Sequence, residues 1–255
     1  GVEYRFIYSP LLSERDFLYG PPDSGYEDNA LRFGIFSYAI AALLRRERYA
    51  ITHLNDWQSA LVALLVKKEK TIRTRVLYTI HNLAYQGTFE KSALKELGID
   101  EEYFTMEGVE FYGKLNLMKA GIAYADRVTT VSPTYAKEIL TPEFGCGLEG
   151  FLRHHRRKLS GIVNGIDRAH FSPSNDRALV APYSDPIGKA VNKKAYLKEA
   201  GLTGGTKPLF VFIGRFTWQK GMALLIETLP RIAALECNIA ILGEGETVYH
   251  EAIEA

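Results

Sequence analysis

Two cations, Arg215 and Lys220, stand at positions where an anion could bind. Arg215 follows the apolar run Leu209–Ile213, which is typical of a buried strand, with only Gly214 between them. Lys220 begins a stretch with helical spacing of apolar residues, where backbone N–H groups already favour an anion. A cation there opposes the helix dipole, so a phosphate bound by both residues would explain the pair. Two solvated surface cations are the alternative.

Polar residues also follow three other predicted strands. Asp56 comes after the first of them, His81 after the second and Asn164 after the third. Ligands of open parallel sheets bind beyond the carboxyl ends of the strands, so these residues are candidate ligand contacts. Each also has a structural alternative: a helix N-cap for Asp56, a hydrogen-bonded structural histidine for His81, and a plain turn at Asn164.

The elements that must position these residues alternate along the chain. Apolar, β-branched or aromatic runs predict strands, and apolar residues spaced by three and four predict helices between them. This alternation indicates an α/β protein with parallel sheets. The predicted strands are Tyr4–Tyr8, Ala50–Leu54, Val76–Ile80, Val128–Val131, Leu159–Val163, Leu209–Ile213 and Ile239–Leu242. The predicted helices cover 29–46, 56–68, 113–125, 132–140, 191–201 and 220–235.

The polar, proline-containing stretch Asp167–Asp185 interrupts this rhythm and predicts a crossing between two domains, 1–164 and 165–255. Both ends of the chain have the pattern of interior positions: the N-terminus opens into a strand-like run without a methionine, and the C-terminus stops within a helical pattern. We therefore expect both domains to be incomplete.

Composition excludes several classes of protein. A net charge of +1 gives no support for nucleic acid or an acidic membrane surface as a partner, and no apolar run approaches the length of a membrane span. Two widely spaced cysteines, Cys146 and Cys237, form neither a disulfide framework nor a zinc pattern. The G-x-x-x-x-G-K match at Gly108–Lys114 lacks the following Ser or Thr, so we do not interpret it as a P-loop.

Several motifs occur together and in order: "THLNDWQSAL", "YTIHNLAYQG", "EFYGKLNLMKAGIAYADRVTTVSPTYAKEI", "FGCGLEGFL", "LSGIVNGID" and "GRFTWQKG". With them the chain strongly resembles the glycogen synthase and starch synthase family, and its bacterial glycogen synthases in particular, over essentially its whole length. Many bacterial members read H-x-H-D-W where this chain has Asn55 before Asp56.

The resemblance implies a GT-B fold, in which two Rossmann-like domains face each other across a cleft. It implies a retaining glucosyltransferase that moves glucose from ADP-glucose to the non-reducing end of an α-1,4-glucan, without a metal or other cofactor. The N-terminal domain would lie on the acceptor side, and the C-terminal domain would bind the nucleotide sugar. The expected location is the cytoplasm, or a plastid in a plant or alga.

Carried over by motif, Arg215 and Lys220 resemble the pair that binds the diphosphate and stabilises the leaving group, beside Gly214. His81 and Asp56 resemble catalytic residues on the sugar side. The resemblance also implies substrate contacts for Asn164 at the domain hinge and for Tyr85 and Gln86 near the glucan.

Two family motifs are absent: the N-terminal K-T-G-G-L loop and a late motif with a glutamate and a cysteine. The N-terminal domain would then lack its first strands and the C-terminal domain more than half of its length, so the chain alone is expected to be inactive, with exposed sheet edges. A GT-B transferase that uses UDP-glucose, or an inactive glucan- or nucleotide-binding protein, are the alternatives.

Overall fold

The computed structural model describes residues 1–21 and 23–254. Unit 1 consists of Gly1–Tyr19 and Gly25–Asn164, and unit 2 of Gly20–Ser24 and Gly165–Ala255. The roles and extents predicted for two domains stay predictions. No helix among the described residues is both long and apolar enough to cross a membrane.

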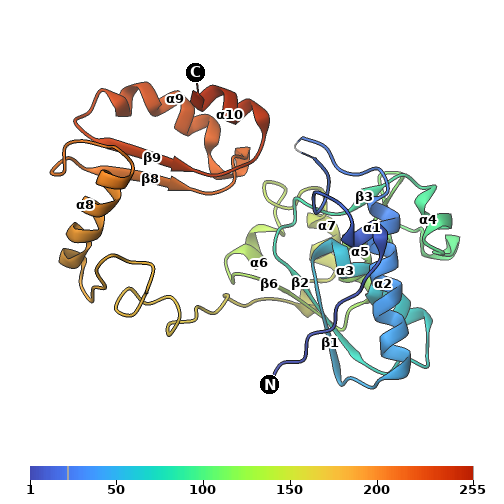
Figure 1. Cartoon of the computed structure of the whole chain (residues 1–255). Coiled ribbons are helices and arrows are strands. Elements are labelled where there is room, and N and C mark those ends of the chain that lie inside the picture. The colour runs from blue at the N-terminus through green and yellow to red at the C-terminus, as the bar shows by residue number, and fades with distance from the viewer. Residues whose placement is uncertain (22, 255) are drawn as a thin grey trace. The chain divides into compact units, whose positions relative to one another are not determined.

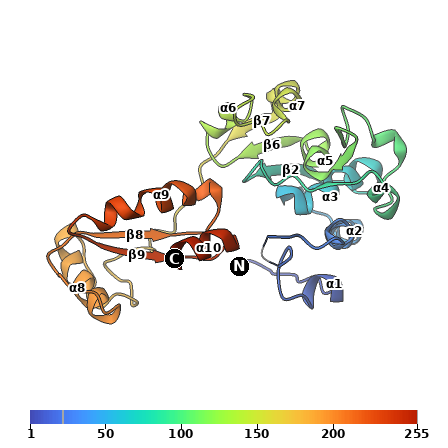
Figure 2. The same ribbon diagram turned by 90° about the horizontal axis from the view of Figure 1, so that it is seen from above.

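Unit 1 is built around a parallel sheet (Figures 1 and 2). Its described strands follow the order β1-β2-β6-β7, with Asn55 of β1 opposite Thr79 of β2. Predicted and observed strands differ by a residue or two, and β7 is two residues shorter than expected. The strands are β1 (Ile51–Asn55), β2 (Arg75–Ile80), β6 (Arg127–Thr130) and β7 (Leu159–Gly161). The helices are α1 (Pro10–Ser13), α2 (Asn29–Arg46), α3 (Asp56–Lys68), α4 (Ala93–Glu96), α5 (Leu117–Tyr124), α6 (Tyr135–Glu138) and α7 (Glu149–His154).

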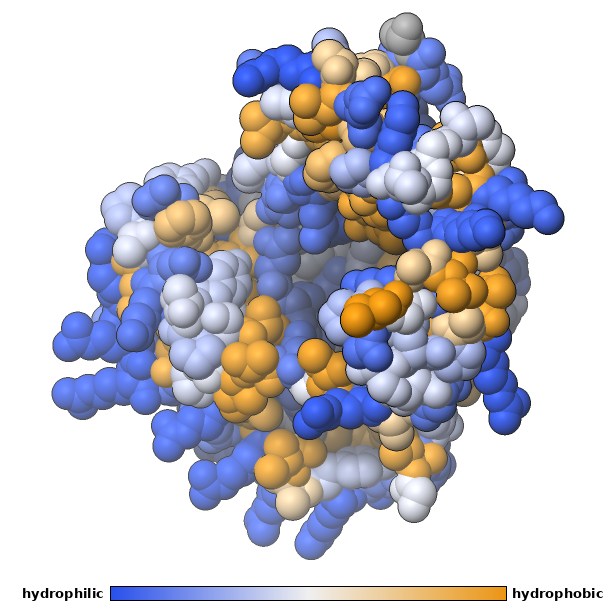
Figure 3. Space-filling model, turned by 90° about the vertical axis from the view of Figure 1, so that its left-hand side faces the viewer, coloured by the Kyte–Doolittle hydropathy of each residue, from blue (hydrophilic) through white to orange (hydrophobic). Residues whose placement is uncertain are grey.

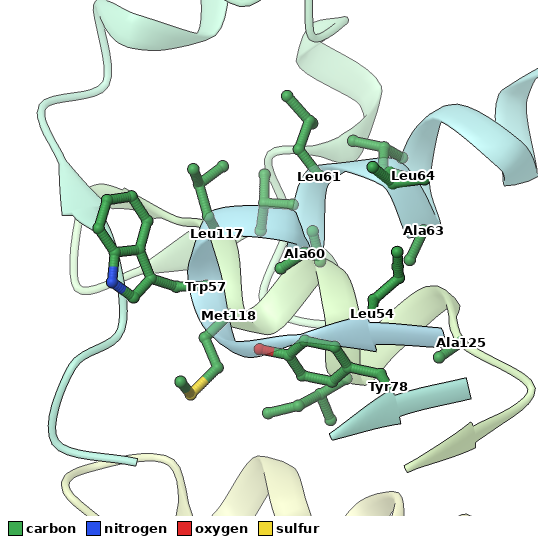
Figure 4. Close-up of a cluster of buried hydrophobic side chains, with 14 of the residues drawn as sticks. Leu54, Trp57, Ala60, Leu61, Ala63, Leu64, Tyr78, Leu117, Met118 and Ala125 are labelled. Carbon is green, nitrogen blue, oxygen red and sulfur yellow. The ribbon is translucent and has the colours of Figure 1, made fainter. Parts of the chain in front are cut away.

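The core of unit 1 lies where α3 and α5 pack against each other and against the sheet (Figure 4). Leu61 and Leu64 of α3 are fully buried, as is Tyr78 of β2. Four apolar residues spaced by three and four along 115–125 are buried as well: Leu115, Met118, Ile122 and Ala125. Helix α3 follows β1 directly, so its packing in the core positions the carboxyl end of β1 beside β2, with which β1 pairs.

A small antiparallel sheet, β3-β5-β4, was not predicted from the sequence. It consists of β3 (Thr88–Phe89), β4 (Glu110–Phe111) and β5 (Lys114–Asn116). The helix predicted over 113–125 therefore begins only at Leu117. A tight turn at Tyr112 and Gly113, both with positive φ, pairs β4 with β5, and the Asn116 side chain then caps α5 by accepting the Lys119 N–H.

The strand predicted at Tyr4–Tyr8 is wrong: this segment has no regular structure. The side chains of Tyr4 and Phe6 are 77% and 92% exposed. The segment has strand-like composition, but no described strand pairs with it, and an isolated extended segment gains no ladder hydrogen bonds.

Unit 2 contains a parallel pair of strands in full register, from Leu209 opposite Asn238 to Ile213 opposite Leu242. The segment 167–185 before it forms turns without helix or strand. The helices and strands of unit 2 are α8 (Lys189–Glu199), β8 (Leu209–Ile213), α9 (Met222–Ala233), β9 (Asn238–Leu242) and α10 (Thr247–Glu254). Helices α9 and α10 contact each other (Figure 1).

Burial is sparse in unit 2. Its buried apolar residues among those described are Leu197, Phe216 and Met222, whereas Val211 and Ile213 of β8 are 54% and 73% exposed. Figure 3 shows apolar side chains in separate groups among polar ones on the face it presents. Two strands bury little surface, so unit 2 has a much smaller core than unit 1.

Candidate active site

The polar residues after β1 and β2 form one hydrogen-bonded cluster. The backbone N–H of His81 donates to Oδ1 of Asp56 at 2.8 Å, and Nε2 of its ring lies 2.9 Å from Oδ1 of Asn55. The two strands are adjacent and parallel, so the residues that follow them emerge at the same edge of the sheet. The structure therefore brings Asp56 and His81 together at this edge.

Asp56 is the first residue of α3 but does not act as its N-cap. Its φ is +53°, in the left-handed region, where Asp is tolerated better than most residues. The N-cap position belongs to Asn55, whose side chain makes no capping hydrogen bond. The carboxylate of Asp56 thus turns toward β2 rather than toward its own helix, which removes the N-cap explanation for this residue.

Ser59 holds the backbone at the start of α3. Its hydroxyl accepts the N–H of Asn55 and donates to the carbonyl of Asn55, both at 2.8 Å. Ser59 is buried, so these two bonds are protected from water. They leave the side-chain amide of Asn55 available for His81.

The loop after His81 is also held by side chains. The hydroxyl of Tyr135 accepts the N–H of Leu83 at 3.0 Å, and Oδ1 of Asn82 accepts the N–H of Ala84 at 3.0 Å. Burial raises the pKa of Tyr135, so its hydroxyl stays neutral. This loop connects the end of β2 to a hollow beside Trp57, which Tyr85 and Gln86 line.

Tyr85 and Gln86 line a hollow of about 510 Å³, together with Trp57 and Phe111. Tyr85 is 46% exposed, whereas Gln86 is buried. Nε2 of Gln86 donates to the carbonyl of Cys146 at 3.0 Å, and its Oε1 accepts from Asn116 at 2.6 Å. Tyr85 is therefore free to meet a ligand, while most of the hydrogen-bonding capacity of Gln86 serves the fold.

Gly87 follows at a close approach of backbone and ring. Its φ is +62°, and a β-carbon there would lie 2.4 Å from the ring of Trp57. Only glycine fits this position, because both the conformation and the space exclude a side chain. The "YQG" sequence and the "DW" sequence are thus packed against each other.

In unit 2, Gly214 and Arg215 follow β8, and Lys220 ends a short 3₁₀ turn, Trp218–Lys220. Gly221, with φ +75°, leads into α9 at Met222. Lys220 thus precedes the first turn of α9 rather than lying in it. Arg215 and Lys220 are both exposed, and within residues 1–21 and 23–254 no hydrogen bond or ion pair involves either side chain.

The loop after β9 packs onto the Gly214–Phe216 segment. A β-carbon on Gly243 would lie 1.9 Å from the carbonyl oxygen of Gly214, and one on Gly245 would lie 2.3 Å from that of Phe216. Phe216 also exchanges backbone hydrogen bonds of 2.8 and 2.9 Å with Glu244 and Glu246. The two glycines of the "LGEGE" sequence, Gly243 and Gly245, therefore let this loop support the backbone beside Arg215.

The structure thus assembles two sets of predicted site residues. Asp56 and His81 lie together in unit 1, with Tyr85 and Gln86 in the hollow next to Trp57. Gly214, Arg215 and Lys220 lie on one loop of unit 2. Asn164, the last residue of unit 1, is exposed. In the described part of the chain, no group of three or more His, Cys, Asp or Glu side chains is placed to hold a metal ion.

The parallel α/β units, with polar residues beyond their strand ends, are consistent with a partial GT-B fold, and the similar starch synthase structure reported below supports it. The family model for the starch synthase catalytic domain matches residues 1–154. The chain belongs to this family.

Relatives with known names agree with this assignment. The chain is 44% identical to glycogen synthase 2 of Geobacter metallireducens, over 96% of this chain and 52% of that protein. It is 45% identical to the glycogen synthase of Aquifex aeolicus, over 94% and 53%. A solved structure, the catalytic domain of starch synthase IV from Arabidopsis thaliana bound to ADP and acarbose, has a TM-score of 0.84 and 34% identity, over 91% of this chain and 50% of that one. The chain spans about half the length of the curated relatives it matches.

Proposed function

We propose that this protein is a retaining glucosyltransferase of glycogen synthesis. It would move glucose from ADP-glucose to the non-reducing end of an α-1,4-glucan. The observation that carries the proposal is the loop from Gly214 to Lys220. It presents two exposed cations, which have no side-chain partner among the described residues, directly after a strand and before a helix. Exposed cations in this position suit a diphosphate.

The chemistry needs positive charge at the leaving group. When the bond between glucose and phosphate breaks, negative charge grows on the diphosphate, and fixed cations stabilise that charge in the transition state. Arg215 offers a planar fork of donors and Lys220 a compact point charge. The proposal includes no resident metal or cofactor, because these two side chains would supply the neutralisation.

The cluster of unit 1 would bind the sugar. His81 and Asp56 are held together at the strand ends and would line the pocket for the transferred glucose. Tyr85, half exposed in the hollow beside Trp57, would contact the glucan, and Asn164 would contact the donor. The proposal includes neither nucleic acid nor a membrane as a partner. We expect the protein to be located in the cytoplasm.

The choice of nucleotide rests on relatives. The similar starch synthase structure carries ADP in its name, and the named bacterial relatives are glycogen synthases. These names favour ADP-glucose as the donor, with UDP-glucose as the alternative to be measured.

The test is transfer of labelled glucose to a glycogen primer by the complete gene product, with ADP-glucose and UDP-glucose offered in parallel. Lys220→Ala is the test variant, and Lys198→Ala, which removes an exposed lysine of α8, is the matched control. We expect transfer from ADP-glucose, with kcat/KM lowered on the order of 100-fold by Lys220→Ala and unchanged by Lys198→Ala. Transfer from neither donor would exclude the enzymatic function, and transfer from UDP-glucose alone would correct the donor.

A further inference from the structure

His81 is held at two points by two consecutive residues of the neighbouring strand end. Its main chain donates to Asp56, and Nε2 of its ring lies 2.9 Å from Oδ1 of Asn55. The main-chain contact places the residue, and the side-chain contact sets the orientation of the imidazole. The contact with Asn55 therefore affects which hydrogen bonds the imidazole of His81 can make with a ligand.

The side chain of Asn55 contacts His81 instead of capping its own helix, α3. Asparagine is among the preferred N-cap residues, and capping a helix stabilises it. Asn55 occupies the N-cap position of α3 in an extended conformation, with φ −129° and ψ 125°, yet its side chain makes no capping bond. The bonds to Ser59 hold its backbone, so the amide is directed across to β2.

An amide oxygen accepts hydrogen bonds and cannot donate them, so Nε2 of His81 must carry the proton in this contact. A neutral imidazole has one N–H, which leaves Nδ1 with a free lone pair. An amide, unlike a carboxylate, brings no negative charge to the ring. The charged group that contacts His81 within the described chain is Asp56, through the backbone N–H.

We propose that Asn55 is a positioning residue that holds His81 as the Nε2–H tautomer, with Nδ1 free to accept a hydrogen bond from a hydroxyl group of the bound glucosyl unit. The second half of this statement rests on the proposed function, in which His81 lines the glucose pocket. The first half concerns the protein alone. His81 would then recognise the sugar as an acceptor, while Arg215 and Lys220 supply the positive charge.

The first measurement is ¹⁵N NMR of the histidine rings in the labelled protein, at alkaline pH where the imidazoles are neutral. The chain has six histidines, and His81→Gln assigns the signals of His81. Asn55→Leu removes the acceptor, and Asn55→Asp keeps an oxygen in its place. Gln58→Leu, an amide-to-leucine change on α3 whose side chain bonds to Tyr19 instead, is the matched control.

We expect His81 to be protonated at Nε2 in the unmodified protein, in Asn55→Asp and in Gln58→Leu. In Asn55→Leu, the ratio of the Nε2–H to the Nδ1–H form should fall by about 2- to 12-fold, the worth of one net hydrogen bond. A predominant Nδ1–H form in the unmodified protein, or an unchanged ratio in Asn55→Leu, overturns the proposal.

The second measurement is kcat/KM for glucose transfer by the same variants of the complete gene product. We expect a loss on the order of 10-fold in Asn55→Leu and a smaller loss in Asn55→Asp. If the tautomer shifts but kcat/KM does not, Nδ1 is not the acceptor for the sugar. If the unmodified protein transfers no glucose at all, the proposed function fails, while the NMR result still decides the role of Asn55 toward His81.

Discussion

The carboxylate of Asp56 accepts the backbone N–H of His81 at 2.8 Å, across the carboxyl ends of two adjacent parallel strands. Asp56 adopts a left-handed backbone conformation to make this contact, at the first residue of α3. A carboxylate that crosses from one strand end to the next ties the two site residues together before any ligand binds. The contact has consequences for stability that can be measured apart from activity.

Substitutions of Asp56 should separate the hydrogen bond from the backbone conformation. Asp56→Asn keeps an oxygen acceptor and tolerates a positive φ, so we expect less than about 1 kcal/mol of destabilisation. Asp56→Ala loses both and should cost about 1–3 kcal/mol. Asp56→Gly relieves the backbone but loses the acceptor, and should fall between them. Urea unfolding gives the order; equal stability of the Ala and Asn variants would refute a structural role for the carboxylate.

Removing the buried amide of Gln86 should destabilise unit 1. Gln86→Ala leaves the carbonyl of Cys146 and the amide of Asn116 without their partner, at a cost of about 1–3 kcal/mol. Tyr85→Ala, at the neighbouring half-exposed position, should change the free energy of unfolding by less than about 1 kcal/mol. Denaturant titration of both variants tests this contrast, and equal effects would contradict it.

A methyl group on Gly243 should disturb the loop that carries Arg215. Its β-carbon would collide with the carbonyl of Gly214, so Gly243→Ala should cost about 1–3 kcal/mol and loosen the Gly214–Phe216 backbone. Gly205→Ala is the control, because a β-carbon there meets nothing within 4 Å and the φ is not positive. Amide hydrogen exchange at Gly214 and Phe216 should accelerate in Gly243→Ala and not in Gly205→Ala. Unchanged exchange in both variants would show that the loop after β9 does not support the Gly214–Phe216 segment.

Lys158 should contribute a rise in the stability of unit 1 with pH in the alkaline range. Its ammonium donates to the carbonyls of Ala123 and Ala125 at the end of α5, but burial lowers the pKa of Lys158 from 10.5 to about 8. Between these two pH values the unfolded chain binds more protons than the folded one, so the free energy of unfolding increases as pH rises.

Urea unfolding at several pH values between about 8 and 10.5 measures this slope. Lys158→Met should reduce it, whereas Lys137→Met, at an exposed position on α6, should leave it unchanged. A slope that is the same in Lys158→Met as in the unmodified protein would show that the lysine keeps its ordinary pKa in the folded state.

The alternation of strands and helices could be read directly from the sequence. The helices predicted over 29–46 and 56–68 have the observed bounds, and β8 is found at Leu209–Ile213 as expected. These elements are long, strongly periodic or β-branched, so local pattern and tertiary packing favour the same structure. Tyr4–Tyr8 has an equally strand-like composition but pairs with no strand in the described part of the chain, and β4 and β5 are too short to have a pattern of their own.

The sequence by itself determined which residues follow each strand, and therefore that Asp56, His81 and Arg215 stand at strand ends. It did not determine their contacts, because the hydrogen bond between Asp56 and His81 joins residues 25 positions apart and depends on the pairing of β1 with β2. The tertiary structure also decided that Gln86 is buried and Tyr85 half exposed, although they are neighbours, because the side chain of Gln86 bonds to Asn116 and Cys146, which lie 30 and 60 positions away. The packing of Gly243 against Gly214 likewise exists only once β9 lies beside β8.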